Sequence, residues 1–182
     1  MKILIACEYS GRVRDAFIAQ GHNAISCDLL PSDTPGPHFQ GDMFSLPLKG
    51  FDLIIAHPPC TYVCVSGNRH YTGTQQRIDG CRFIERIWDI NIAKICIENP
   101  VGVINTLIPK MPKPQYIQPW MFGHGETKKT GLWKRGLPDL KPTNIVDGRL
   151  DRIHKMPPSK ERGKIRSLTY QGIADAITKQ WG

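Results

Sequence analysis

The stretch FDLIIAHPPC, residues 51–60, is a short apolar run that stops in two prolines and a cysteine. Its centre, residues 53–56, is apolar on both faces, which is typical of an interior strand in a sheet covered on both sides. Because prolines cannot continue the hydrogen bonds of a strand, the strand must end at His57. The two prolines hold the backbone extended and carry Cys60 just past the carboxyl end of the strand. In an open α/β sheet, ligands bind at this edge.

The segment before this strand predicts a β-α-β unit. Residues 2–7 (KILIAC) read as a buried strand, residues 12–20 as a helix that faces the sheet, and residues 23–27 (NAISC) as a second strand ending at Asp28. Gly21 ends the helix, as glycine commonly does just past a helix terminus. We expect a right-handed crossover between two parallel strands.

The remaining chain predicts two loops, a helix, a strand and a closing helix. Residues 29–40 are rich in proline and should be irregular, and residues 61–74 should form a mobile or substrate-ordered loop. Apolar residues at helical spacing predict a helix over residues 75–89, and the run 93–97 predicts a buried strand ending in Glu98-Asn99-Pro100. Prolines then interrupt every regular run until the helix predicted for residues 168–181.

The charge is unevenly spread along the chain. Residues 1–100 hold 9 Lys/Arg and 10 Asp/Glu, a net charge of −1, whereas residues 101–182 hold 15 Lys/Arg and 6 Asp/Glu, a net charge of +9. The basic half indicates a polyanionic partner, most simply nucleic acid, although a solvated basic surface has the same composition.

Composition favours one domain in a reducing compartment. The 182 residues suffice for a single core, and no apolar run approaches the roughly 18 to 20 residues of a membrane span. The first residues read as a strand and a turn rather than a signal peptide, so we expect a cytoplasmic location. The six cysteines are then expected to be free thiols, with Cys7, Cys27 and Cys96 as core residues.

Polar residues follow four of the predicted strands and should converge at one edge of the sheet. A glycine turn at Gly11, followed by a carboxylate at Asp28, is an arrangement that holds the ribose hydroxyls of nucleotide-like cofactors. Cys60 can attack an electrophilic carbon as its thiolate, and Glu98 can protonate a ring nitrogen as the attack proceeds. The alternative is a structural cysteine and an exposed acid at a strand end.

These residues resemble motifs of the DNA (cytosine-5) methyltransferases, because Pro58-Pro59-Cys60 followed by Glu98-Asn99 is similar to the Pro-Pro-Cys and Glu-Asn motifs of that family. The resemblance implies an α/β, Rossmann-like methyltransferase fold, a mostly parallel sheet with helices on both faces. It implies that Cys60 adds to carbon 6 of a flipped-out cytosine and that Glu98 binds nitrogen 3. Carbon 5 then takes a methyl group from S-adenosylmethionine. Pro59 and Asn99 belong to the same catalytic motifs.

The resemblance also implies a cofactor site and a division of the chain. Glu8, Tyr9, Ser10 and Gly11 are expected at the methionine end of S-adenosylmethionine, Asp28 on the ribose hydroxyls, Asp42 on the adenine amino group, and Pro58 beside the cofactor. Residues 1–101 would form the cofactor and catalytic core, residues 102–167 an irregular, basic, substrate-facing part, and residues 168–182 the closing helix.

Over its whole length the chain resembles small, mostly phage-encoded proteins of cytosine-methyltransferase type, through stretches such as ACEYSG, HPPC, ENP, KKTGLW and TYQGIADA. A phage origin would make the location the host cytoplasm. The chain departs from the larger enzymes in three motifs: Cys7-Glu8-Tyr9-Ser10-Gly11 replaces Phe-x-Gly-x-Gly, Glu98-Asn99-Pro100 replaces Glu-Asn-Val, and Gln-x-Arg-x-Arg has no clear counterpart. The large target-recognition domain is also missing.

The candidate substrate surface is therefore the basic, aromatic-bearing stretch 116–166, which contains Trp120, Phe122 and Trp133. Lysines and arginines contact phosphates and aromatic rings stack on bases, although such rings are more often core residues. The candidate DNA contacts are Gln118, Lys128, Lys129 and Arg166.

The predicted activity is transfer of a methyl group from S-adenosylmethionine to carbon 5 of cytosine in DNA, either double- or single-stranded, through a covalent Cys60 adduct. A free cytosine nucleotide modified by the same chemistry is the first alternative. A second is a zinc site built from the neighbouring side chains His57, Cys60, Cys64, His70 and Cys81, although no matching second cysteine pair is present. A third is a catalytically idle nucleic-acid-binding module, which would need neither Cys60 nor Glu98.

Overall fold

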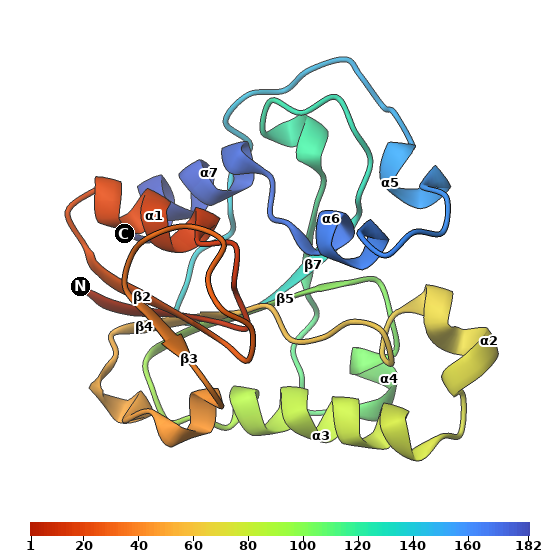
Figure 1. Cartoon of the computed structure of the whole chain (residues 1–182), viewed down its shortest axis with the longest axis horizontal. Coiled ribbons are helices and arrows are strands. Elements are labelled where there is room, and N and C mark those ends of the chain that lie inside the picture. Colours follow the sequence, from red (N-terminus) through yellow and green to blue (C-terminus); the bar gives the residue numbers. More distant parts are fainter.

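A seven-stranded sheet is the centre of the computed structural model, which describes residues 1–182. The strands lie in the order β3-β2-β1-β4-β5-β7-β6 (Figure 1). Along the chain they are β1 (Lys2–Ala6), β2 (Asn23–Asp28), β3 (His38–Gln40), β4 (Leu53–Ala56), β5 (Lys94–Pro100), β6 (Gln115–Ile117) and β7 (Thr130–Arg135). The first five strands are parallel to one another, whereas β7 runs antiparallel to its neighbours β5 and β6.

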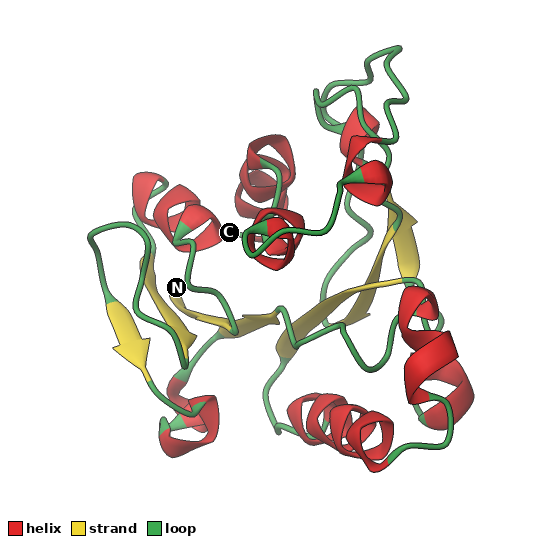
Figure 2. Cartoon of the chain, turned by 45° about the vertical axis from the view of Figure 1, so that its right-hand side comes forward, coloured by secondary structure: helices red, strands yellow, loops and turns green.

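Helices cover both faces of this sheet, as Figures 1 and 2 show. They are α1 (Arg12–Ala19), α2 (Asn68–Tyr71), α3 (Gln75–Trp88), α4 (Ile104–Leu107), α5 (Arg152–Lys155), α6 (Arg162–Ser167) and α7 (Gln171–Trp181). Side chains alternate along the strands, so Ile5 and Ile55 pack on the side of α1 and α7. Leu4 and Ile54 pack on the side of α3 and α4. The predicted α/β architecture with two covered faces is confirmed.

β4 is the interior strand that the sequence predicts. All four of its residues are fully buried, and it pairs in parallel with β1 and β5, with Ile55 opposite Ile5 and Cys96. The backbone N–H of His57 still donates to the carbonyl of Ala6 at 2.9 Å, after which the two prolines leave the sheet. The strand therefore ends where the prolines require it to end.

Two segments predicted as loops contain regular structure. The strand β3 lies at the end of the segment 29–40, where three residues pair with the end of β2 at the edge of the sheet. The segment 61–74 contains the short 3₁₀ helix η3 (Val65–Gly67) and α2. A three-residue edge strand and two single helical turns are too short to carry a periodic pattern, so the glycines, serines and prolines dominated the prediction.

Two other boundaries differ from the sequence prediction. β5 continues through Glu98 and Asn99 to Pro100, because β7 pairs with it residue by residue as far as Thr130. The closing helix begins at Gln171 rather than at residue 168. The basic part 102–167 contains β6, β7 and the short helices α4, α5 and α6, of which none exceeds six residues.

The two ends of the chain lie on the same side of the molecule (Figure 1), and both lie beside the side chain of His22. The amino group of Met1 lies 3.3 Å from His22 Nδ1, and a Cβ atom on Gly182 would lie 2.6 Å from His22 Nε2. Packing of α7 against α1 brings the carboxyl end to this position. No helix of the structure is both long enough and apolar enough to cross a membrane.

Candidate active site

The turn that carries Cys60 is fixed to strand β5. The side-chain amide of Asn99 donates a hydrogen bond of 2.8 Å to the carbonyl of Pro58. The backbone N–H of Cys64 donates to the carbonyl of Cys60 at 2.9 Å, so Cys60 and Cys64 are separated by one closed turn of chain. These bonds place the predicted nucleophile immediately beyond the carboxyl end of β4, as expected from the two prolines.

The chain after Cys60 also pairs with the chain after Pro100. The N–H of Val65 donates to the carbonyl of Val101 at 3.0 Å, and the N–H of Val103 donates to the carbonyl of Val63 at 2.9 Å. Cys64 and Gly102 lie opposite each other in this bridge. The two motifs that the sequence analysis related by spacing are therefore joined through backbone as well as side-chain hydrogen bonds.

Glu98 lies next to His57, the residue that ends β4. Its carboxylate Oε2 is 2.5 Å from His57 Nδ1, and the two side chains are only 17% and 12% exposed. Burial would lower the pKa of His57, but the hydrogen bond and negative charge of Glu98 outweigh it and raise this pKa. Burial would raise the pKa of Glu98, but its bond to His57 outweighs it and lowers this pKa. Both shifts favour a buried ion pair between the two residues.

A cleft with a volume of about 800 Å³ lies over Cys60, a size in the usual range of ligand sites. Pro59, Cys60, Cys64 and Pro100 form its base on the side of the sheet. The segment 151–168, which contains α5 and α6, lies on the opposite side and contributes His154, Lys164, Arg166 and Ser167. Glu98 and Asn99 do not line this cleft but lie behind the turn.

The pKa values of the Cys60 and Cys64 thiols depend on each other. The hydrogen bond with Cys64, followed by burial, raises the pKa of Cys60 well above its usual range. The same bond lowers the pKa of Cys64 to about 5, although burial opposes this, because the Ser66 hydroxyl at 3.0 Å and the backbone N–H groups of Ser66 and Gly67 also stabilise its thiolate. The two shifts favour the thiolate on Cys64 and the protonated thiol on Cys60.

Three of the four predicted substrate residues line the cleft as cations: Lys128, Lys129 and Arg166. The fourth, Gln118, does not line it but accepts a hydrogen bond of 2.9 Å from the backbone N–H of Lys128. The positive charge of Lys128 acts to lower the pKa of Cys60 and Glu98. Gln118 thus holds the backbone of Lys128, whose positive charge acts on both Cys60 and Glu98.

The three aromatic residues of the basic stretch have different surroundings. Phe122 and Trp133 are buried in the core, and the Trp133 indole N–H donates to Asn105 Oδ1 at 2.9 Å. Trp120 is partly exposed and has the Arg149 guanidinium 3.9 Å from the centre of its ring. Trp120 alone of the three is available to contact a base.

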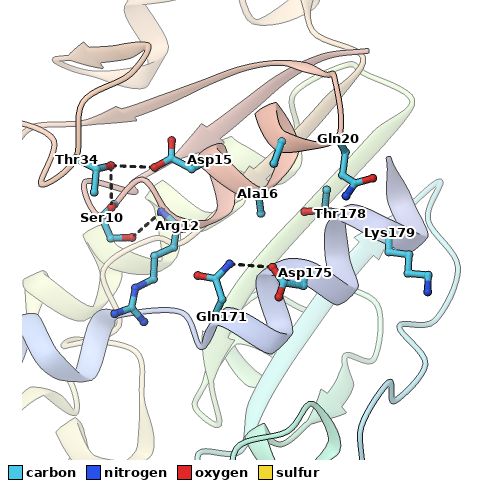
Figure 3. A pocket seen from close by; sticks show the side chains of 11 residues that line it. Ser10, Arg12, Asp15, Ala16, Gln20, Thr34, Gln171, Asp175, Thr178 and Lys179 are labelled. Carbon is cyan, nitrogen blue, oxygen red and sulfur yellow. Dashed lines mark hydrogen bonds between the residues drawn. The ribbon is translucent and has the colours of Figure 1, made fainter.

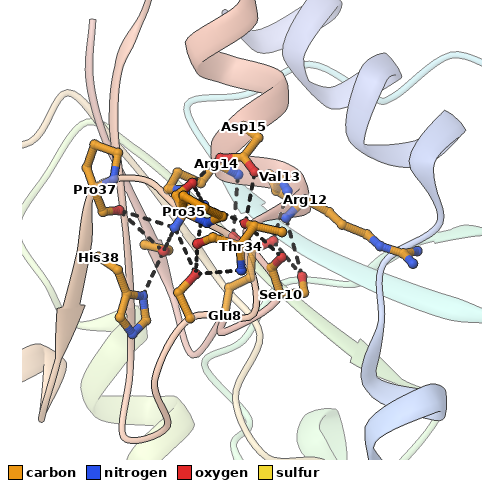
Figure 4. Close-up of polar contacts among 12 residues, drawn as sticks. Glu8, Ser10, Arg12, Val13, Arg14, Asp15, Thr34, Pro35, Pro37 and His38 are labelled. Carbon is orange, nitrogen blue, oxygen red and sulfur yellow. Dashed lines mark hydrogen bonds and ion pairs between the residues drawn. The ribbon is translucent and has the colours of Figure 1, made fainter.

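At the first strand, Glu8 binds the start of helix α1 (Figure 4). The buried Glu8 carboxylate accepts hydrogen bonds from the N–H of Val13 at 2.8 Å and from the hydroxyl of Ser10 at 3.2 Å. A carboxylate at this place stabilises the unpaired N–H groups and the positive end of the helix dipole. Gly11 adopts a left-handed conformation with φ of 75°, and a Cβ atom there would lie 2.2 Å from Thr34 Oγ1. These residues form a rigid turn beside the cleft.

Arg14 connects this turn to the loop that follows β2 (Figure 4). Its guanidinium is fully buried and donates to side-chain or backbone oxygens of Ser26, Ser32, Thr34, Pro35 and Pro37. The loop it organises carries Leu30, Pro31 and Asp33 to the wall of the cleft.

Asp28 ends β2 and Asp42 follows β3, and both lie near enough to Cys7 for their charges to act on its thiol. Together with burial, their negative charges raise the pKa of the Cys7 thiol to about 12. One oxygen of each carboxylate accepts a backbone N–H, from Leu30 at 2.9 Å and from Phe44 at 3.0 Å, and neither carboxylate has an ion-pair partner. Two unpaired carboxylates match the hydroxyl and amino groups of a nucleoside, and their charge matches a sulfonium cation, so these residues fit S-adenosylmethionine.

The remaining predicted cofactor residues lie around a small cavity of about 50 Å³ and at the wall of the cleft. Glu8, Tyr9 and Ser10 line the small cavity together with His57 and residues 167–169. Tyr9 also lines the large cleft, and its hydroxyl lies 2.9 Å from Ser167 Oγ. Pro58 lines neither of these cavities; its carbonyl accepts the hydrogen bond from the side chain of Asn99.

A separate polar groove lies between α1 and α7 (Figure 3). It is lined by side chains of both signs, among them Arg12, Asp15, Asp175 and Lys179. Several of its groups already bond within the chain, such as the Gln171 amide, which donates to Asp175 at 2.8 Å. Cys60 and Glu98 are not part of this groove.

Several residues of the site were not predicted, or were considered only for zinc. No group of three or more His, Cys, Asp or Glu side chains is placed to hold a metal ion, so the five residues of the zinc alternative are not gathered into such a group. Two of them have other partners: His57 binds Glu98, and the Cys64 sulfur lies 3.0 Å from the hydroxyl of Ser66. The four-residue spacing of the two cysteines could have indicated their contact. Lys164 and His154 belong to the basic stretch 116–166 but were not singled out, because nothing in the sequence distinguishes them from its other basic residues.

Neither a protein-family model nor a curated protein matches this sequence. Among solved structures, the fold is similar to a candidate DNA modification methyltransferase encoded within a prophage of Escherichia coli, with a TM-score of 0.53 and 13% identity. It is also similar to the methyltransferase EhMeth of Entamoeba histolytica, with a TM-score of 0.52 and 13% identity. The alignments cover 86% and 87% of this chain.

These similarities show the fold. The chain has the mixed α/β, Rossmann-like architecture of these methyltransferases, with a mostly parallel seven-stranded sheet. It spans 55% and 63% of the lengths of the two similar proteins.

Proposed function

We propose that this protein transfers a methyl group from S-adenosylmethionine to carbon 5 of cytosine in DNA, through a covalent adduct on Cys60. The observation that carries the proposal is the position of Cys60. It lies at the base of a basic cleft, on a turn that Asn99 ties to the strand bearing Glu98. The methyltransferase fold places this turn at the edge of the sheet where ligands of α/β proteins bind.

The chain's own groups match the needs of this reaction. Cys60 reaches its thiolate form by giving its proton to Cys64, and the thiolate then adds to carbon 6 of the ring. For Glu98 to hold ring nitrogen 3, the base would have to pass beyond the residues that line the cleft and reach the end of β5. Pro58, Pro59 and Asn99 keep Cys60 in place, so little conformational freedom is lost on attack.

The cofactor would lie along the ends of β1 and β2. Asp28 and Asp42 would hold its hydroxyl and amino groups, and Glu8, Tyr9, Ser10 and Gly11 would form the rigid turn at its other end. When bound, S-adenosylmethionine supplies the electrophilic methyl group. Glu8 would act mainly by fixing α1, because its oxygens are already taken by Val13 and Ser10.

The basic side of the cleft would bind the phosphates of the substrate. Lys128, Lys129, Lys164 and Arg166 line it, and the only carboxylate in the lining, Asp33, is paired with Lys164 at 2.7 Å. Such a set neutralises phosphate charge without reading sequence. We therefore expect little or only short-context sequence preference.

A free cytosine nucleotide is a second candidate substrate, and one observation favours it. The Lys164–Asp33 ion pair and the Tyr9–Ser167 contact join the α6 region to the opposite wall of the cleft. All four of these residues line the cleft. A small phosphorylated ligand could enter without displacing them, whereas a polynucleotide would have to break them.

The test is incubation with labelled S-adenosylmethionine and either cytosine-containing DNA or deoxycytidine monophosphate. We expect label on carbon 5 with the wild-type protein and none with Cys60→Ala. With DNA that contains 5-fluorocytosine, the wild type should form a stable covalent adduct and Cys60→Ala should not. Absence of label on both substrates, together with no calorimetric binding of the cofactor, would refute the proposal.

A further inference from the structure

His57 is a buried side chain for which the proposed reaction has so far given no role. It is the last residue before the two prolines, three positions ahead of Cys60, and its Nδ1 atom contacts Glu98. The other ring nitrogen, Nε2, is buried without a hydrogen-bond partner. His57 therefore makes its one polar contact with the acid on which the proposed reaction depends.

The charges around His57 favour its protonated form. Glu98 on β5 and Glu8 after β1 both act to raise its pKa, whereas burial and the positive charge of Lys128 before β7 act to lower it. The two carboxylates outweigh the other effects. A single proton is thus held between His57 Nδ1 and Glu98 Oε2, mainly on the histidine.

This arrangement poses a chemical problem for Glu98. To assist addition of a thiolate to the ring, the carboxyl group must donate a proton to nitrogen 3. A carboxylate that is ion-paired to a histidine has no proton of its own at neutral pH. The proton must come from elsewhere, and the nearest one lies on His57 at 2.5 Å.

We propose that His57 is a positioning residue that stores the proton which Glu98 delivers to the ring nitrogen. This inference rests on the proposed function. As the Cys60 sulfur bonds to carbon 6, the π electrons of the carbon 5–carbon 6 bond shift toward nitrogen 3. Nitrogen 3 takes a proton from Glu98, and Glu98 takes the proton of His57 Nδ1, which leaves a neutral imidazole. When the sulfur leaves, the proton on carbon 5 passes to water, the electrons of that C–H bond restore the carbon 5–carbon 6 double bond, and the Cys60 thiolate departs. The proton on nitrogen 3 returns through Glu98 to His57, so the His57–Glu98 pair neither gains nor loses a proton over the cycle.

The structure also explains why this role requires His57 in particular. Its position at the end of β4 is fixed by the backbone bond to Ala6 and by Pro58, which Asn99 holds. Asn99 and Glu98 are neighbours on β5, so the same two residues of one strand hold the turn and the histidine. The imidazole therefore stays aligned with the carboxylate while Cys60 approaches the base.

The first experiment measures the proton directly, without substrate or cofactor. The imidazole resonances of the whole protein are followed by NMR from pH 5 to pH 9, and the His57 signal is identified by its loss in His57→Asn. We expect a pKa above the ordinary 6.5 in the wild type. In Glu98→Gln, which keeps an acceptor but removes the charge, the pKa should fall below the wild-type value. An ordinary pKa that is unchanged by Glu98→Gln would overturn the proposal.

The second experiment compares His57→Asn with His57→Ala by the pH dependence of methyl transfer. The Asn side chain can donate a hydrogen bond to Glu98 but cannot release a proton. If His57 only held Glu98 in place, Asn would restore activity and leave the profile unchanged. We expect instead that both variants lose activity at pH 8, by about 100-fold, which is typical of a lost proton donor. Their alkaline limb should lie at lower pH, because the proton is then held by Glu98 alone.

The two experiments separate this inference from the proposed function. A protein with a raised, Glu98-dependent His57 pKa that methylates no cytosine substrate would contradict the proposed function and support the proton-sharing pair. An active His57→Asn variant with the wild-type alkaline limb would contradict the role of His57 and support the proposed function. Lys49→Ala, on the far edge of the sheet beside Met1 and Phe51, is the matched control and should change neither readout.

Discussion

Arg14 is the residue on which the wall of the cleft most depends. Its buried guanidinium satisfies carbonyl and hydroxyl groups along residues 32–37, a loop with two prolines and little regular structure. Arginine suits this task because its planar group offers five donors in fixed directions. In the sequence, Arg14 is one of three charged residues of helix α1, beside Arg12 and Asp15, and nothing marks it as buried. Its burial follows from the loop folding over it.

Replacing Arg14 should therefore be costly. We expect Arg14→Met to lower the free energy of unfolding by about 3 kcal/mol or more, since it leaves several buried acceptors without donors. Arg12→Met is the matched control two positions earlier, because Arg12 is exposed and donates only to the carbonyl of Thr169. Urea denaturation of both variants measures the difference. An equal, small loss for the two would show that the buried network contributes little.

Cys64 should be more reactive than Cys60 near neutral pH. With its pKa lowered to about 5, Cys64 is a thiolate at pH 6.5, whereas the raised pKa of Cys60 keeps that residue protonated. We expect iodoacetamide at pH 6.5 to label Cys64 first, as located by tandem mass spectrometry. In Cys64→Ser, Cys60 loses the bond that raises its pKa and should be labelled at lower pH than in the wild type. Cys81→Ser should behave like the wild type, and labelling of Cys60 before Cys64 would contradict the assignment.

Strand β5 is the element that assembles the site. It extends three residues past the last residue that pairs with β4, and these three, Glu98, Asn99 and Pro100, pair only with β7. The extension places the carboxylate beside His57 and the amide beside Pro58. The next residues then pair with the chain that follows Cys60. Thus β7, an antiparallel strand from the basic half, supports the catalytic motif of the first half.

Gly102 lies where the chain after β5 passes closest to the chain after Cys60. A Cβ atom there would lie 2.0 Å from the carbonyl oxygen of Val63, a backbone atom that cannot yield easily. We expect Gly102→Ala to destabilise the protein by about 1–3 kcal/mol and to abolish the difference in reactivity between Cys60 and Cys64. Gly163→Ala in α6, where nothing lies within 4 Å, should be neutral or slightly stabilising. Thermal unfolding and alkylation of the two variants test this. A Gly102→Ala variant with the stability and the cysteine reactivity of the wild type would refute it.

The elements of the first hundred residues could be predicted well because each carries a complete local pattern. Apolar spacing predicts the strands at 53–56 and 2–7 and the helix near 12–20. The two prolines mark the end of the first of these, and Gly21 marks the end of the helix. β3, α2 and the extension of β5 could not be predicted, because each depends on pairing with a distant segment. For the same reason Cys60 and Glu98 could be named from sequence, while the engagement of Glu98 by His57 and of Cys60 by Cys64 could not.

For the molecule as a whole, folding concentrates the charge asymmetry of the sequence at one place. The half with net charge +9 supplies Lys128, Lys129, Lys164 and Arg166 to a cleft whose base comes from the half with net charge −1. The cations thus face a base that contains no carboxylate. A polyanion bound there gains electrostatic attraction without strong competition from nearby carboxylates.

Binding to a polyanion should therefore depend steeply on salt. If the protein binds DNA through these cations, the logarithm of the association constant should fall linearly with the logarithm of salt concentration. We expect Lys128→Ala and Lys129→Ala each to reduce this slope by about 1, and Lys49→Ala to leave it unchanged. Fluorescence anisotropy with labelled single- and double-stranded DNA measures the slopes. A slope that is equal in all variants would exclude the cleft as the binding surface.

Both ends of the chain meet at His22, and this makes the molecule nearly a closed ring. A short flexible linker from Gly182 to Met1 should complete the ring, and the chain could then be opened at the exposed Ser159, between α5 and α6. Such a circular permutant should unfold cooperatively with wild-type circular dichroism, because no strand is cut, whereas one opened inside β4 should not fold. In this permutant the sheet would be intact, but the segment 151–168 that lies over the cleft would be cut between α5 and α6. Comparing the rate of ligand binding in the permutant and the wild type would then measure how far this segment limits access to Cys60.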